Sequence, residues 1–134
     1  MNAERTEEER ARRYALRVAP LWDAPGEVLK WLTTGDENLR PAARRAAWRA
    51  PSIAGRSSCG AAECAATRAA ALAATTGAAR ESIRAAILAT GWAAAHSAVI
   101  AGAPWKDDRD REDTWAAARD AARMEAKDWE VEMA

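Results

Sequence analysis

The sequence predicts an all-α protein, a compact alanine-rich bundle of about five to six helices around a buried central helix. Three observations support this fold class. Alanine, which has the highest helix propensity, occupies 38 of the 134 positions. Five prolines and seven glycines are too few to interrupt many helices. The stretch 83–99 carries no formal charge after Arg84, so other helices must cover it on every side. The length suggests one helical domain, residues 1–134.

Apolar residues at helical spacing predict a first helix over residues 4–22. Pro20 lies inside this pattern and is expected to kink or end the helix. A short second helix should follow, with Asp23 near its cap and Pro25 near its first turn. Gly35 is the expected stop, because glycine readily adopts the left-handed conformation that ends many helices.

The third expected helix is capped by Asp36 or Asn38 and carries Pro41 in its first turn. The segment 51–60 is rich in serine, glycine and proline, and it is therefore interpreted as a loop. A fourth helix is expected over residues 61–76, with Gly77 as its stop.

The central helix is expected over 79–101, with Gly102 and Pro104 closing it. Gly91 and the alanines near it should let another helix approach closely, with space for a tryptophan or leucine from that helix. The acidic segment 106–113 resembles a calcium loop only in its charge, because it lacks a central glycine. It is interpreted as a charged connector or helix start.

The last helix is expected over 113–133 and has one apolar stripe. The stripe contains Trp115, Ala118, Ala122, Ala126, Trp129 and Met133. A stripe of this length must be covered, and docking on the same chain is the favoured interpretation. A two-fold homodimer is the alternative.

The formal net charge is zero, but the charges are unevenly distributed. Residues 40–84 carry eight arginines against two acids, whereas residues 85–134 carry ten acids against six bases. Internal pairing or a polarised surface fits this pattern better than nucleic-acid binding does. The candidate partner-binding surface consists of Arg40, Arg44, Arg45, Arg49 and Arg56.

His96 is the only histidine, and its neighbour Ser97 points away from it on a helix. It is predicted to be a core or half-buried histidine bonded to a backbone carbonyl, with no catalytic role. Cys59 and Cys64 could join His96 as zinc ligands, which keeps a helical metal-binding enzyme as an alternative. Because no fourth ligand is present, the favoured expectation is no enzyme, no metal and no cofactor.

The charged segment 1–17 does not resemble a secretory signal, so a cytoplasmic protein with reduced cysteines is expected. The span 85–105 has the length of a membrane helix. It consists mostly of small residues that insert poorly, so a buried helix of a soluble protein is preferred over a membrane span.

Three segments carry a resemblance to a known family. They are Tyr-Ala-Leu-Arg-Val-Ala-Pro-Leu-Trp-Asp at 14–23, the Asp-to-Trp stretch at 36–48, and the Ala-Gly-Ala helix near His96 at 85–98. The chain resembles the immunity protein family of bacterial polymorphic toxin systems. That resemblance implies a non-catalytic protein that neutralises a partner protein. A small phage-derived or structural helical protein that self-associates is the other alternative.

Overall fold

The structure confirms the all-α fold class. It is a computed structural model that describes residues 3–58, 60–127 and 129. Across these residues the only strand-like feature is one antiparallel bridge between Trp22 and Ala54. The helices, in order, are α1 (Ala3–Val18), the 3-10 turn η1 (Ala19–Leu21), α2 (Gly26–Thr34), α3 (Arg40–Arg49), α4 (Ala61–Thr75), α5 (Ala79–Ala101) and α6 (Asp108–Lys127).

Proline and glycine end the helices close to the predicted positions. α1 stops at Val18, and Pro20 lies in η1, because a proline ring clashes with the preceding helical turn. The expected α-helical continuation to residue 22 is therefore wrong. Gly35 ends α2 with φ +69°, and Gly77 follows α4 with φ +82°. Both angles lie in the left-handed region, where glycine avoids the steric strain of other residues.

The predicted caps of α2 and α3 are wrong. α2 begins after Pro25 and α3 begins after Leu39, and neither helix has a side-chain cap. Asp36 closes a local turn instead, since its carboxylate accepts the backbone N–H of Asn38 at 2.9 Å.

The acidic segment starts α6, as the interpretation of a charged helix start predicted, although the helix begins at Asp108 rather than at residue 113. The Asp107 carboxylate accepts the backbone N–H of Asp110 at 2.8 Å, the bond that an N-cap residue makes. The Asp110 carboxylate in turn accepts the backbone N–H of Lys106 at 3.2 Å. These two bonds, which resemble a capping box, explain why the helix begins earlier than expected.

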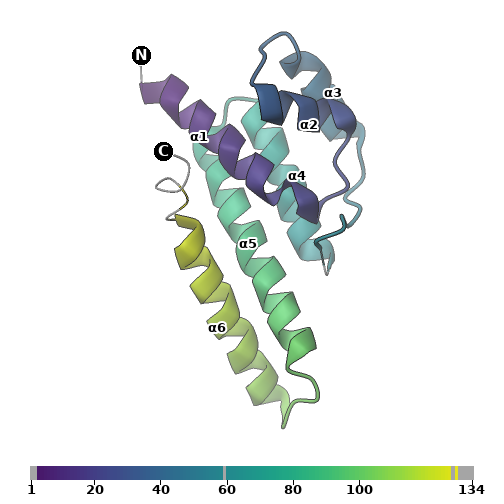
Figure 1. The fold of residues 1–134 in the computed structure, drawn as a ribbon, viewed down its shortest axis with the longest axis vertical. Helices are drawn as coiled ribbons and strands as arrows, with labels where there is room; N and C mark the ends of the chain where they lie inside the picture. The colour runs from purple at the N-terminus through teal and green to yellow at the C-terminus, as the bar shows by residue number, and fades with distance from the viewer. Residues whose placement is uncertain (1–2, 59, 128, 130–134) are drawn as a thin grey trace.

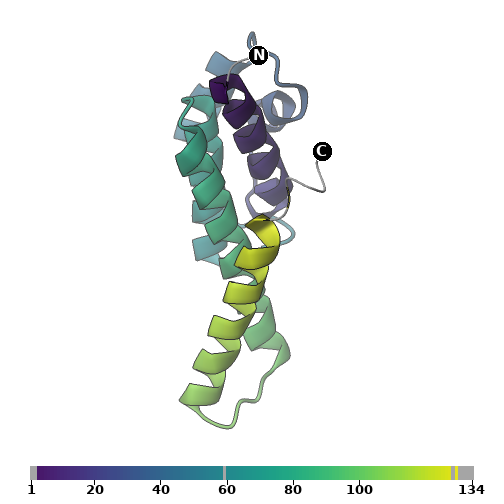
Figure 2. The same cartoon turned by 90° about the vertical axis from the view of Figure 1, so that its left-hand side faces the viewer.

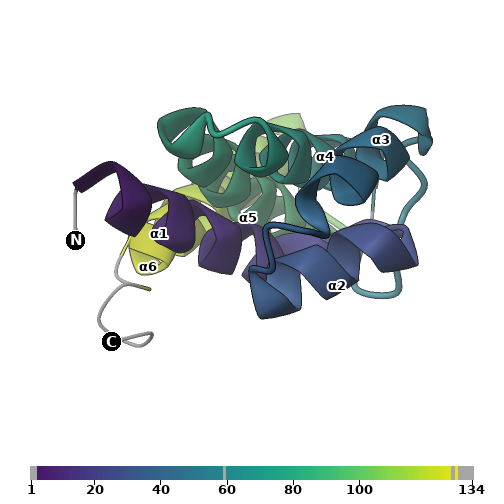
Figure 3. The same ribbon diagram turned by 90° about the horizontal axis from the view of Figure 1, so that it is seen from above.

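Helices α1, α4 and α5 pack side by side, and α2 and α3 lie together at one end of this group (Figure 3). α4 and α5 run antiparallel, and so do α5 and α6 (Figure 1). Tyr14, Trp22 and Trp31 supply large side chains to the core, each at most 3% exposed. Much of the remaining core is alanine, whose small side chain allows helix axes to approach closely.

The central helix α5 is covered less completely than the sequence predicts. Its last turns, beyond His96, extend past the start of α4 and lie beside α6 (Figures 1 and 2). The 23 residues of α5 rise about 34 Å and the 15 residues of α4 only about 22 Å, so α4 cannot cover it. Among the described residues, α5 alone is long and apolar enough to cross a membrane by length and composition, and 28% of that window is buried.

The stripe of the last helix docks on the same chain, as predicted. Trp129 is 5% exposed, its ring centroid lies 5.3 Å from that of Tyr14, and the Arg17 guanidinium lies 4.7 Å from its ring centroid. Ala126 is fully buried against the core. Met133 lies outside the described residues.

Gly91 admits a neighbouring helix, as expected, but the neighbour presents a different kind of side chain. A Cβ at Gly91 would lie 2.8 Å from Cγ of Arg123 and 3.1 Å from Cγ of Arg119. The aliphatic stems of two arginines, rather than a tryptophan or leucine, therefore cover this face of α5.

Candidate functional site

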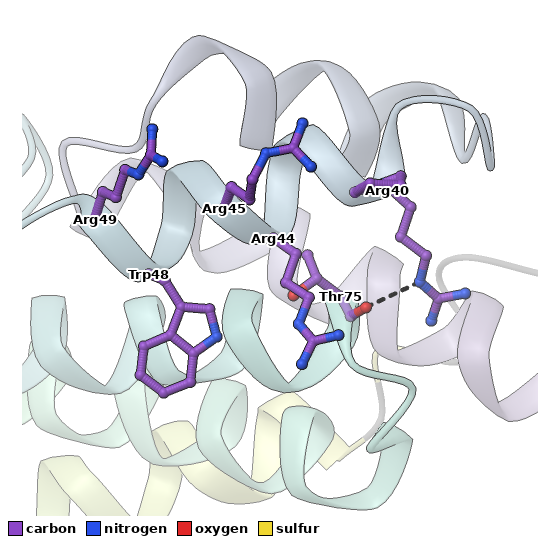
Figure 4. A pocket seen from close by; sticks show the side chains of 7 residues that line it. Arg40, Arg44, Arg45, Trp48, Arg49 and Thr75 are labelled. Atoms are coloured by element: carbon purple, nitrogen blue, oxygen red, sulfur yellow. Dashed lines mark hydrogen bonds between the residues drawn. The ribbon is translucent and has the colours of Figure 1, made fainter.

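Four of the five predicted arginines gather around one hollow at α3. Arg40, Arg44, Arg45 and Arg49 line a hollow of about 510 Å³ together with Pro41, Trp48 and Thr75 (Figure 4). Arg44 and Trp48 lie on one flank of α3, and Arg45 and Arg49 lie on the other. Arg56 is exposed in the loop 51–60 and does not line the hollow.

Arg40 is a structural residue rather than a free surface charge. Its Nε donates to the carbonyl of Thr75 at 3.0 Å, and its Nη2 donates to the carbonyl of Ala74 at 3.2 Å. These carbonyls belong to the last turn of α4 and have no partner within the helix. The guanidinium also lies 5.5 Å from the ring centroid of Trp31. Arg40 therefore fastens α3 to α4.

Arg68 of α4 makes the reverse connection, which the sequence analysis missed. Its Nε donates to the carbonyl of Ala50 at 2.8 Å, and its Nη2 donates to the carbonyl of Trp48 at 3.1 Å. Arg40 and Arg68 thus each bind the C-terminal carbonyls of the other helix, an arrangement we call the arginine clamps. The one sequence signal was a single charge in the middle of an alanine-rich helix.

The remaining residues form what we call the α3 face: Arg44, Arg45, Trp48 and Arg49. All four are exposed, and 62% of Trp48 is accessible to solvent. Within the part of the chain that the structure describes, no hydrogen bond or ion pair engages the three guanidinium groups. The face therefore carries three positive charges without a partner in these ranges, with Arg44 on the same flank of the clamped helix as Trp48 and Arg45 and Arg49 on the other flank.

A second polar cluster lies where α4 begins against α5. Nδ1 of His96 lies 2.6 Å from Oε2 of Glu63. Glu63 is fully buried, whereas the His96 side chain is 28% exposed. The prediction that His96 bonds to a backbone carbonyl is wrong, because its partner is a carboxylate 33 residues earlier in the chain. The sequence does not indicate this contact, because an acid in the first turn of a helix usually interacts favourably with the helix dipole.

Gly60 closes over this pair. A Cβ at Gly60 would lie 2.7 Å from Oε1 of Glu63 and 3.0 Å from Cε1 of His96, so a larger residue would displace them. Oε1 of Glu63 has no hydrogen-bond partner among the described residues. Within the described residues, the imidazole of His96 is therefore the hydrogen-bond partner of this carboxylate.

The exposed side of His96 borders a hollow of about 480 Å³ between α5 and α6. Its lining is His96, Val99, Arg111, Glu112 and Trp115. The His96 and Trp115 rings meet edge to face with centroids 4.6 Å apart, and Trp92 meets Trp115 at 5.4 Å. We call this cavity the α5–α6 hollow.

One of the three ligands of the alternative zinc site, Cys59, lies outside the described residues. Cys64 is buried, and its Sγ lies 3.2 Å from the carbonyl oxygen of Ala61 and 3.6 Å from that of Ser52. No group of three or more histidine, cysteine, aspartate or glutamate side chains gathers in the described ranges.

Comparisons with known proteins add no assignment: no family model matches the chain, and no curated protein or solved structure is significantly similar to it. The α3 face and the Glu63–His96 pair are the two features of the molecule that bear on its function.

Proposed function

We propose that this chain is a non-catalytic protein-binding module whose α3 face binds an acidic surface of a partner protein. The observation that carries the proposal is the group of three exposed arginines that share α3 with the exposed Trp48 and make no hydrogen bond or ion pair within the described ranges. Tryptophan and arginine are the residues most enriched among the hot spots of protein interfaces.

Trp48 provides the apolar part of the binding energy. A tryptophan buries roughly 150–250 Å² when it is fully covered. Covering the exposed 62% of Trp48 would contribute on the order of 2–3 kcal/mol. The arginine clamps hold α3 in place before binding, so little conformational entropy is lost at this helix on association.

The charges around Trp48 define the partner. Arg44, Arg45 and Arg49 can each form paired hydrogen bonds with a carboxylate. A nucleic acid is the weaker candidate, because the chain has a net charge of zero and residues 85–134 are acidic. Binding to an acidic protein surface requires only a local positive patch, and three arginines provide one.

The resemblance of residues 14–23, 36–48 and 85–98 to immunity proteins supports a neutralising role for this binding. In that role the module would cover a functional surface of its partner in the cytoplasm. A second copy of the chain is the competing partner, since α6 begins with several acids.

A peptide-display selection tests the proposal without knowledge of the partner. Random peptides are selected on the wild-type protein and counter-selected on the Trp48→Ala variant. The enriched peptides should carry net negative charge, and Trp48→Ala should weaken their binding about 30-fold, the effect of a hot-spot residue worth about 2 kcal/mol. Arg45→Ala should weaken binding by a smaller factor.

Arg56→Ala is the matched control, because this exposed arginine lies off the hollow and should leave binding unchanged. Enriched peptides without acidic character, or equal binding to wild type and Trp48→Ala, would contradict the proposal. Tighter binding of a labelled DNA or RNA oligonucleotide than of any acidic peptide would favour a nucleic-acid partner. Concentration-dependent dimers that Trp48→Ala abolishes in sedimentation equilibrium would favour self-association.

A further inference from the structure

Helix α3 exposes one side along its whole length. The α3 face and Pro41 make up this exposed side, whereas Ala43 and Ala47 on the opposite side are buried. The ten residues of α3 rise about 15 Å, so the exposed side is longer than it is wide. The hollow that its arginines line opens on this side. A partner that covers the whole face therefore lies along the helix rather than at one of its ends.

The α3 face consists of two rows of side chains. Arg44 and Trp48 form one row, and Arg45 and Arg49 form the other, on opposite flanks of the helix (Figure 4). Within each row the two residues are four positions apart, which is about 6 Å along the helix axis. A complementary partner must therefore offer two acids to one row, and an acid and an apolar side chain to the other.

An α-helix presents side chains in this arrangement. Residues four positions apart lie on the same face of a helix and have the same rise of about 6 Å, so a helix aligned with α3 matches both rows. Its backbone groups are bonded within the helix, and it therefore needs only side-chain contacts from its partner. The side chains of the α3 face are what the protein offers here.

An extended segment fits the α3 face less well. Successive side chains of a strand point to opposite sides, so one side of a strand supplies a single row. If the strand is turned so that its side chains reach both rows, its backbone amides and carbonyls point toward α3. The backbone of α3 is bonded within the helix, and the carbonyls at the ends of α3 and α4 already accept bonds from Arg68 and Arg40. The backbone of a bound strand would therefore find no free partner there.

We propose that the partner element bound by the α3 face is an amphipathic α-helix that carries acids at four-residue spacing beside one apolar residue. The apolar residue covers Trp48, two acids one turn apart pair with Arg45 and Arg49, and a third acid pairs with Arg44. This inference rests on the proposed function and narrows the acidic surface of the partner to a helix.

Three fluorescein-labelled peptides of about 16 residues test the helix, because an isolated helix of this length is only marginally stable in water. All three carry the same pattern of glutamates and leucine on an alanine-rich background. The first has no further change, the second has a hydrocarbon staple on its opposite side that holds it helical, and the third has a central proline. Fluorescence anisotropy with the full-length protein should show the tightest binding for the stapled peptide, since its ordering cost is already met. The proline peptide should bind at least about tenfold more weakly than the first.

A fourth peptide has the composition of the first but carries its glutamates at two-residue spacing, and it should also bind at least about tenfold more weakly. Arg49→Ala should weaken binding of the stapled peptide, whereas Arg56→Ala, which lies off the hollow, should not. Equal affinity for all four peptides, or tighter binding of the proline peptide than of the stapled one, would show that the partner is acidic but not helical. If none of the four binds, the acidic partner of the proposed function is wrong as well.

Discussion

The α3 face and the Glu63–His96 pair differ in where the charge lies and in what compensates it. Arg44, Arg45 and Arg49 are exposed and have no partner in the described chain, yet water solvates them at little cost. Glu63 is completely buried and must have a partner, because no water reaches it. The stability of the fold should therefore depend on the buried pair, and binding to a partner should depend on the exposed charges.

The largest expected effect comes from breaking the buried pair. His96→Ala leaves Glu63 buried without its imidazole, and should lower the free energy of unfolding by about 3 kcal/mol. Glu63→Gln retains the shape of the side chain and should cost only about 1 kcal/mol. Urea denaturation measures both values. Equal and negligible losses would mean that the pair does not contribute to folding.

A smaller loss is expected from crowding the pair without removing either member. Gly60→Ala places a methyl group 2.7 Å from Oε1 of Glu63 and should cost about 1–3 kcal/mol. Gly26→Ala is the control, because its new Cβ would meet nothing within 4 Å. That variant should be stabilised by about 0.4–1 kcal/mol. Thermal unfolding measures both variants. If Gly60→Ala has the same melting temperature as the wild type, Glu63 and His96 shift to make room for the methyl group at no cost.

The smallest expected loss of stability comes from a comparison of two arginines that lie one helical turn apart. Arg40→Ala removes two hydrogen bonds to carbonyls of α4 and should cost about 1–2 kcal/mol. Arg44 makes no hydrogen bond or ion pair within the described residues, so Arg44→Ala should change the free energy of unfolding by less than about 0.5 kcal/mol. If the two variants unfold at the same urea concentration, the distinction between clamp and binding surface is wrong.

The same arginines mark the limit of what the sequence could predict. Arg44, Arg45 and Arg49 are exposed as expected, because helical spacing decides which side of an amphipathic helix they occupy. Arg40 could not be assigned to structure from local spacing, since its carbonyl partners lie 34 and 35 residues away in α4.

The ends of α5 could be predicted from the sequence, whereas the hydrogen-bond partner of His96 could not. The glycines at 77 and 102 and the proline at 104 bracket a continuous helix, and the structure has that helix at Ala79–Ala101 as predicted. The partner of His96 depends on how far α4 slides along α5 when the helices pack. A shift of one turn would bring a different residue of α4 beside the imidazole, and no local pattern encodes that register.

The arginine clamps have a consequence for local unfolding. Each clamp bonds the end of one helix to a side chain of the other, so fraying of α3 releases a donor from α4 and fraying of α4 releases a donor from α3. We therefore expect the two helices to open as one cooperative unit, with the amides of both C-terminal turns exchanging with solvent at a common rate. Trp48 should then keep its exposed position on α3 for as long as α4 stays folded.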